Sequence, residues 1–189
     1  MPRLDGRDLW PWLAIAATLV LVALQLRYQG RLWMCSCGRF YLWVGDARSS
    51  DTSQHLFDPY SFTHVLHGFI FCWLIVLLVP RLWWTWGLWL AVATEAVWEA
   101  VENSDFVIQR YRDAGVRGYF GDTVVNSLGD IIMCGFGFVL ARNLGFGRSL
   151  ALFVAVEVVL LFWIRDSLVL NVLMLIYPVE GIKQWQAGY

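Results

Sequence analysis

The sequence predicts an all-α integral membrane protein that forms one polytopic domain over residues 1–189. Hydrophobic residues make up 59% of the chain and charged residues only 15%, and the mean hydropathy of +0.56 exceeds that of soluble globular domains. The 12 tryptophans and 12 phenylalanines fit this class, because aromatic rings gather where the hydrocarbon core meets the lipid headgroups. Five apolar stretches also approach the length of about 20 residues that a helix needs to cross a bilayer.

Five transmembrane helices are therefore expected. The predicted spans are residues 9–26, 60–79, 82–101, 122–141 and 149–164. The fifth span is short, but Arg148 and Arg165 bracket it and can snorkel to the two interfaces. The apolar run that begins at Leu168 ends at Pro178 and is too short to cross, so a short interfacial or re-entrant helix is expected near the C-terminus.

The connections alternate between short and long, which predicts that the long loops, 27–59 and 102–121, lie on one side of the membrane. A basic N-terminus before an anchor-like first span favours a periplasmic location for these loops. The distribution of positive charge points the other way, because five of the 14 Lys and Arg residues fall on the short-loop side and the remainder on the long-loop side. We still expect periplasmic long loops, since the arginines there lie among acidic residues with which they can pair.

Polar residues inside the predicted spans cluster toward the long-loop side. Three spans each carry a pair of candidate catalytic residues at helical spacing, which places each pair on one helix face: His64 and His67, Glu99 and Glu102, and Asp122 and Asn126. Glu95, Asp130 and Glu157 lie deeper. Ionisable groups at that depth are costly and normally face the interior of a bundle, so they are also candidates for function.

Simpler interpretations exist for individual residues. Glu102 could reach the interface from the last helical turn, and the two histidines could bond loop carbonyl groups. Three glycines of the fourth span are expected to be close-packing positions: Gly129, Gly135 and Gly137.

The motif "CSCG" separates Cys35 from Cys37 by one residue. This spacing is too tight for the common zinc ribbon, and a disulfide between the two would be strained. Two free thiols, an intermolecular bond, or metal ligation completed by His55 remain open. Cys72 and Cys134 lie inside predicted spans and are expected to be packing residues.

Four further residues are candidates for substrate binding: Arg110, Arg165, Asp166 and Asn171. An arginine near the membrane surface can neutralise a phosphate group or clamp an anionic headgroup. The net charge of −1 provides no polybasic surface for nucleic acid, which is excluded as a partner.

Several segments carry a resemblance to a known family. They are "WMCSCG", "SQHLFDPYSFTHVLHGF", "EAVWEAVENSDFVIQRYR", "GYFGDTVVNSLGDI" and "IRDSLVLNVLMLIYPVEGIKQWQAG". Together they closely resemble domain of unknown function family 2585, a proteobacterial family of multi-pass membrane proteins, and the resemblance implies location in the cell inner membrane. A looser pattern is similar to VanZ-like membrane proteins and implies a role in the cell envelope. Its positions here are His64 or His67, Glu99 or Glu102, Arg110, Asp122, Asn126 and Gly129.

Two functions compete. The first is an enzyme at the periplasmic face that acts on a membrane lipid or a lipid-linked envelope substrate, with a histidine and a carboxylate as general base and acid. The cofactor is open, and a divalent metal is one candidate because imidazole and carboxylate groups together suit zinc, iron or manganese. Its candidate ligands are His64, His67, Glu99, Glu102 and Asp122. The alternative is a non-catalytic subunit, or an assembly or binding protein, of a membrane complex.

Overall fold

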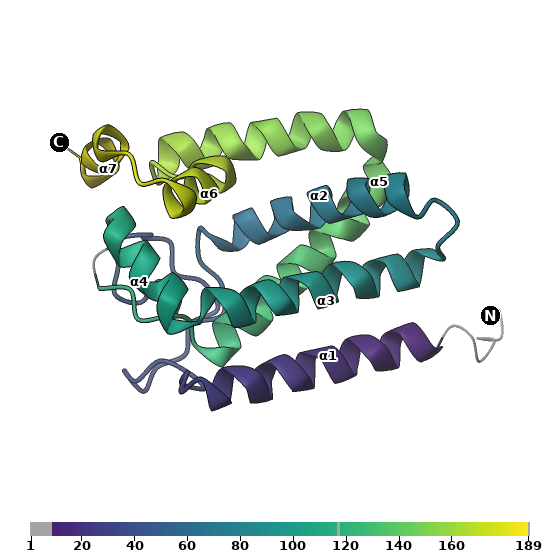
Figure 1. Cartoon of the computed structure of the whole chain (residues 1–189), viewed down its shortest axis with the longest axis horizontal. Helices are drawn as coiled ribbons and strands as arrows, with labels where there is room; N and C mark the ends of the chain where they lie inside the picture. The colour runs from purple at the N-terminus through teal and green to yellow at the C-terminus, as the bar shows by residue number, and fades with distance from the viewer. Residues whose placement is uncertain (1–8, 117, 189) are drawn as a thin grey trace.

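The computed structural model describes residues 9–116 and 118–188, which form seven α-helices and no β-strand. Figure 1 shows the helices, which are α1 (Leu9–Tyr28), α2 (Ser61–Leu78), α3 (Trp84–Glu102), α4 (Asp105–Ala114), α5 (Val124–Trp163), α6 (Leu168–Ile176) and α7 (Glu180–Ala187). The predicted all-α class is confirmed.

The number of helices that could cross a membrane differs from the five predicted spans. Three helices, α1, α2 and α5, are long and apolar enough to cross a membrane. Helix α3 covers the predicted third span, but its four tryptophans and three glutamates lower its hydropathy. The predicted fourth and fifth spans lie together within α5.

Helix α5 is divided by a sharp break at Gly145. This residue has φ 73° and ψ 170°, a conformation that is open to glycine and strained for residues with a Cβ atom. Figure 1 shows the segments on either side of the break running in opposite directions. The chain thus turns back on itself within the segment that joins the predicted fourth and fifth spans.

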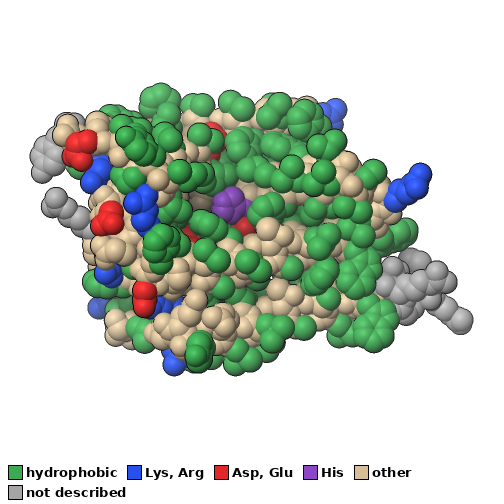
Figure 2. Space-filling model, viewed as in Figure 1, with side chains coloured by type: hydrophobic (Ala, Val, Ile, Leu, Met, Phe, Trp, Pro, Cys, Tyr) green, Lys and Arg blue, Asp and Glu red, His purple; other side chains and the backbone are tan. Residues whose placement is uncertain are grey.

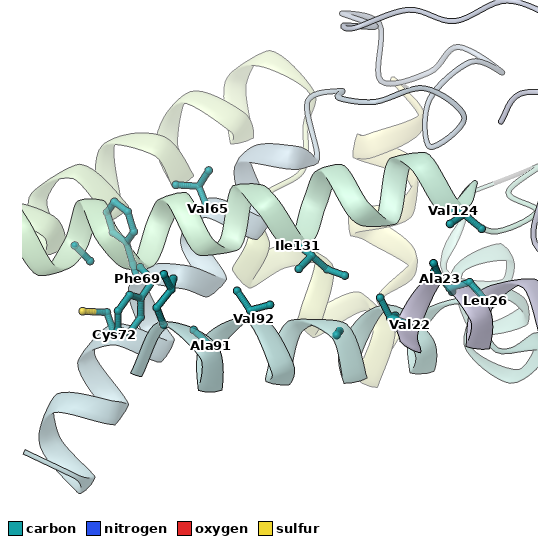
Figure 3. Packing of buried hydrophobic residues seen from close by; sticks show 14 residues of the cluster. Val22, Ala23, Leu26, Val65, Phe69, Cys72, Ala91, Val92, Val124 and Ile131 are labelled. Carbon is teal, nitrogen blue, oxygen red and sulfur yellow. The ribbon is translucent and has the colours of Figure 1, made fainter. Parts of the chain in front are cut away.

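The long helices form a bundle in which α2 packs along α5 and α1 packs along α3. Figure 3 shows its core, where Phe69 of α2, Val92 of α3 and Ile131 of α5 lie close to one another. A Cβ atom on Gly68 would overlap the backbone of Cys134, and one on Gly137 would overlap the carbonyl group of Val65. These two glycines therefore let α2 and α5 approach to backbone contact, as small residues do between membrane helices.

The remaining elements gather at one end of the bundle. Figure 1 shows α4, α6, α7 and the segment between α1 and α2 at this end, while the α2–α3 turn lies at the opposite end. We predicted loop for 102–121, but this segment contains α4, which is capped by the Ser104 side chain and ends at Gly115 with φ 114°. The apolar run from Leu168 forms α6, the short helix that was expected, and a further short helix, α7, follows Pro178.

Candidate functional site

Two histidines of α2 and a glutamate of α3 form the centre of the site. His64 Nδ1 lies 2.5 Å from Glu95 Oε1, and His67 Nδ1 lies 2.9 and 3.0 Å from the two Glu95 oxygens. Because an ionised carboxylate only accepts hydrogen bonds, each ring donates its Nδ1–H to Glu95. The spacing of His64 and His67 by three residues directs both rings at one point on α3.

Glu99 lies one helical turn from Glu95 and extends the cluster. Its Oε1 atom is 3.5 Å from His64 Nδ1, and its side chain is fully buried. Neither Glu99 oxygen has a hydrogen-bond partner within residues 9–116 and 118–188. On the other side of His64, Asp130 of α5 places Oδ2 at 3.8 Å from Nε2 and accepts a 2.7 Å hydrogen bond from Ser61.

A second polar layer lies between this cluster and the end of the bundle that carries α4. Tyr111 of α4 donates a 2.7 Å hydrogen bond to Glu102. Asp122 accepts hydrogen bonds from Asn103 at 2.8 Å and from Tyr119 at 3.0 Å. Asn103 directly follows α3 and Asp122 directly precedes the Thr123 cap of α5, so this pairing joins the two helix ends.

A cavity of about 830 Å³ connects the two layers to the surface. Its polar lining includes His64, His67, Glu102, Asp122 and Asp130. Its apolar lining comes mainly from α6, through Leu168, Val172, Met174 and Leu175, and Trp98 of α3 adds to it. Figure 2 shows a histidine and acidic side chains at the bottom of a hollow whose surroundings are largely hydrophobic. The cavity is thus polar at its floor and partly apolar on its walls.

Three basic residues from separate segments also line the cavity: Arg48, Arg165 and Lys183. Arg48 donates to the carbonyl oxygen of Gln186 at 3.2 Å, and Arg165 donates to that of Trp185 at 3.0 Å. The two guanidinium groups thus meet at the C-terminal end of α7, where positive charge is favourable. Each guanidinium has five N–H donors, so these bonds leave donors for an anion in the cavity.

Three carboxyl groups outside the long helices have raised pKa values. Burial raises the pKa of Asp166 to about 6, although Ser167 and Asn171 donate hydrogen bonds to it. Burial also raises the pKa values of Asp58 and Asp122 above the ordinary carboxyl value. The loop end of the site therefore holds acids that are easier to protonate than exposed carboxyl groups.

A family described as "Protein of unknown function (DUF2585)" matches residues 26–188 of the chain. The chain belongs to the DUF2585 family.

Similar proteins include three that bear the name UPF0314 protein, from Paracoccus denitrificans (strain Pd 1222), Brucella anthropi (strain ATCC 49188) and Sphingopyxis alaskensis (strain DSM 13593). The first is 44% identical over 179 residues, 94% of this chain and 93% of that protein. The second is 44% identical over 177 residues, 93% of this chain and 90% of that protein. The third is 44% identical over 179 residues, 94% of this chain and 95% of that protein.

No solved structure matches this DUF2585 chain. The family match over residues 26–188 confirms the predicted resemblance to domain of unknown function family 2585. The looser resemblance to VanZ-like proteins stays a hypothesis based on a short pattern of residues.

The structure brings most of the predicted site residues of this DUF2585 protein to one cavity. Those that line it are His64, His67, Glu102, Asp122, Arg165, Asp166 and Asn171. Glu99 lies beside His64. Asn126 is buried next to the Thr123 cap, to which its backbone N–H donates. Their roles in catalysis or substrate binding stay predictions.

Arg110, a predicted binding residue, does not itself line the cavity. Its guanidinium donates to the carbonyl oxygens of Leu175 and Ile176, at 2.7 and 3.0 Å, at the C-terminal end of α6. Glu157 binds the other end of α6, where it accepts hydrogen bonds from the backbone N–H groups of Leu168 and Val169. This geometry favours a role for both residues in holding α6 in place.

Two groups of side chains within this cluster of the DUF2585 protein have donor atoms close enough to share a metal ion. The first consists of His64, His67 and Glu95, and the second of His64, Glu99 and Glu102. Asp122, a predicted ligand, belongs to neither group within the described residues. Glu95 was absent from the predicted ligands, although the stripe of glutamates at positions 95, 99 and 102 could have indicated it.

Cys35 and Cys37 form a disulfide with each other, although their spacing of two positions was expected to strain such a bond. Both residues line the cavity at its loop end, together with Asp51. Cys72 and Cys134 are free and buried, in agreement with their predicted packing role.

Proposed function

We propose that this chain is a multi-pass protein of the cell inner membrane, whose long-loop end faces the periplasm. In this proposal five helical segments cross the bilayer, namely α1, α2, α3 and the parts of α5 before and after Gly145. The apolar character of α1, α2 and α5 supports membrane insertion. The Cys35–Cys37 disulfide supports the orientation, because disulfides persist in the periplasm and are rare in the cytosol.

The proposed activity is that of a metal-dependent enzyme acting on a membrane lipid or a lipid-linked envelope substrate. The observation that carries it is Glu99, a fully buried carboxylate whose two oxygens lack hydrogen-bond partners among the described residues. A buried charge without a partner is too costly to persist. A proton or a cation must therefore balance Glu99, and the His64 imidazole and the Glu102 carboxylate have donor atoms close enough to share a metal ion with it.

The donor atoms suit a divalent ion. Two imidazoles and a carboxylate form the ligand set of many catalytic zinc sites and of mononuclear iron sites. Neighbouring ligand atoms around a tetrahedral zinc ion lie about 3.4 Å apart. His67 Nδ1 lies 2.9 and 3.0 Å from the Glu95 oxygens and His64 Nδ1 lies 3.5 Å from Glu99, which is close to this spacing. His64 Nδ1 lies only 2.5 Å from Glu95, so these two groups would have to move apart to share an ion. Binding at Nδ1 would require each neutral ring to carry its proton on Nε2 in place of Nδ1.

The cavity supports a lipid-like substrate with an anionic group. Its apolar wall on α3 and α6 suits acyl or isoprenoid chains, and its basic residues Arg48, Arg165 and Lys183 suit a phosphate. A bound metal ion would lower the pKa of a coordinated water molecule. Glu99 would accept the proton of the attacking water, while the arginines would balance charge on the phosphate.

Metal analysis of the purified protein tests this proposal. We expect about one zinc, iron or manganese ion per chain, as for a single catalytic site, and loss of most of it in His67→Ala. Glu99→Gln should keep the protein inserted at normal abundance but abolish function, because an amide cannot accept a proton. The control is Asp113→Asn, which changes an exposed carboxylate on α4. A wild-type protein that binds none of these ions at micromolar concentration would contradict the proposal.

The non-catalytic alternative predicts a different combination of results. If the chain is a binding or assembly subunit, Glu99→Gln at normal abundance should leave the cellular phenotype intact, whether or not metal is bound. The full burial of Glu95 and Glu99 favours this alternative, because the two histidines that contact these glutamates line the cavity and the glutamates themselves do not.

A further inference from the structure

The segment between α1 and α2 holds a second cluster of reactive side chains. Both sulfur atoms of the Cys35–Cys37 disulfide, a ring nitrogen of His55 and a carboxylate oxygen of Asp51 lie within 4.8 Å of one another. Cys37 is exposed and Cys35 is half-buried. The cluster therefore combines an accessible disulfide with an imidazole, apart from the His64 cluster of the helical bundle.

His55 is buried and has one unused polar atom. Only 2% of the residue is exposed, and its Nδ1 atom accepts a 3.2 Å hydrogen bond from the backbone N–H of Tyr41. Since Nδ1 accepts, the proton of the neutral ring resides on Nε2. Nε2 has no hydrogen-bond partner among the described residues, and Asp51 Oδ1 is 3.9 Å away. An unpaired buried donor is costly, so Nε2–H needs an acceptor that this oxidised state does not supply.

We propose that Cys35 and Cys37 form a redox-active pair that exchanges with thiol substrates at the mouth of the cavity, and that His55 stabilises the thiolate released from the pair. This inference does not rest on the proposed lipid enzyme. The substrate class is a cysteine thiol, either of a small molecule or of a peptide.

The exchange proceeds in two balanced steps. A substrate thiolate attacks the exposed sulfur of Cys37, the Cys35–Cys37 bond breaks, and a mixed disulfide forms while Cys35 leaves as a thiolate. A second substrate thiolate then attacks the mixed disulfide, which releases the substrate disulfide and leaves Cys37 as a thiolate. Two electrons pass from the substrate thiols to the pair, and Cys35 and Cys37 take up two protons.

The geometry favours Cys35 as the leaving group. Its sulfur already accepts a 3.1 Å hydrogen bond from the backbone N–H of Cys37, and the His55 ring lies in the same cluster. Donors of this kind stabilise a thiolate and make it leave faster. The reduced pair would offer Nε2–H the acceptor that the disulfide state does not provide.

A metal site built from the same four residues is the competing interpretation. The sulfur atoms are bonded to each other, and the Tyr41 hydrogen bond uses the Nδ1 lone pair of His55. A metal ion at Nε2 would require the Nε2 proton to be lost while Nδ1 still accepts. These two contacts favour thiol exchange over metal binding.

The experiment measures reduction of the pair in the purified full-length protein, with glutathione in one arm and a peptide with two cysteines in the other. Peptide mapping separates Cys35 and Cys37 from Cys72 and Cys134. Reversible reduction by either thiol supports the proposal, and the faster arm identifies the source of the substrate. Resistance of the folded wild-type protein to both thiols would overturn it, as would a reduced pair that binds zinc and no longer exchanges.

Two variants isolate the role of His55. His55→Asn retains an oxygen near the Nδ1 position for Tyr41 but lacks a donor near Nε2, whereas His55→Gln places an amide N–H near Nε2. We expect reduction to slow about tenfold in His55→Asn and to stay within about threefold of wild type in His55→Gln. Equal rates in wild type and His55→Asn would show that His55 plays no part. Glu99→Gln should exchange at the wild-type rate, which separates this test from that of the proposed enzyme.

Discussion

At the scale of single residues, the acids of the site differ in how they are held. Glu95 is contacted by two imidazoles, whereas Asp122 depends on Asn103 and Tyr119. Asp166 accepts a 2.9 Å hydrogen bond from the backbone of Ser167 and a longer one, 3.5 Å, from Asn171. Its stabilisation as a carboxylate is therefore weak, in agreement with its raised pKa.

The raised pKa of Asp166 predicts a pH-dependent stability. Its pKa is about 6 in the folded protein against an ordinary value of 3.8. A raised folded pKa means that the contribution of Asp166 to stability is complete below about pH 4 and is lost as the pH rises through about 6. Asp166→Asn has no such titration, so the variant should gain stability over wild type across this window, by at most about 3 kcal/mol.

Melting temperatures in detergent from pH 4 to pH 7 check this expectation. The wild-type curve should fall relative to that of Asp166→Asn, while Asp113→Asn, at an exposed position, should follow wild type. A constant difference between wild type and Asp166→Asn over the whole range would contradict the prediction.

At the scale of helices, the crossing of α2 and α5 positions the site, because α2 carries the histidines and α5 carries Asp130. The helices meet through Gly68 and Gly137, where an added Cβ atom would overlap the partner backbone. Such an overlap cannot be relieved by moving a side chain. The separation of the two helices, and hence the position of His64 relative to Asp130, depends on these glycines.

Substitution of Gly137 by alanine should therefore destabilise the protein by about 1 to 3 kcal/mol, as overpacking does. Gly147→Ala is a matched control, since Gly147 also lies in α5 and a Cβ atom there would have no neighbour within 4 Å. The control should be neutral or slightly stabilising, because alanine favours a helix. Equal melting temperatures for the two variants would show that the close contact is not required.

At the scale of the whole molecule, the elements around the cavity lie at one end of the bundle. The cysteine pair, the basic residues and most of the second polar layer come from segments that join or follow the long helices, and Glu102 is the last residue of α3. In the proposed orientation this end faces the periplasm. A lipid-linked substrate would then enter from the membrane between α3 and α6, with its anionic group near Arg48 and Arg165.

Reporter fusions test the orientation. A reporter that is active only in the periplasm should be active after Ser50, in the segment between α1 and α2, and inactive after Arg81, in the α2–α3 turn. The fusion points are at opposite ends of the bundle, so the two results should always differ. An active reporter at Arg81 and an inactive one at Ser50 would reverse the proposed orientation.

Much of this organisation was predictable from the sequence. Hydropathy identified the apolar segments and the all-α class, and spacings of three and four residues identified the polar pairs on α2 and α3. Both signals are local, because residues three or four positions apart in a helix always lie on the same face of it. The close-packing role assigned to Gly137 was correct for the same reason, since small residues on an apolar helix have few other uses.

Only the tertiary structure decided which groups meet. The rotation of each helix about its own axis made Glu95 the partner of both histidines, and the position of α6 drew Arg110 to the carbonyl oxygens of Leu175 and Ile176. The break at Gly145 turned the second part of α5 back in the opposite direction to the first (Figure 1), and loop packing placed His55 beside Cys35 and Cys37. These contacts link residues far apart in the chain, and they depend on how whole helices and loops pack, which no local spacing encodes.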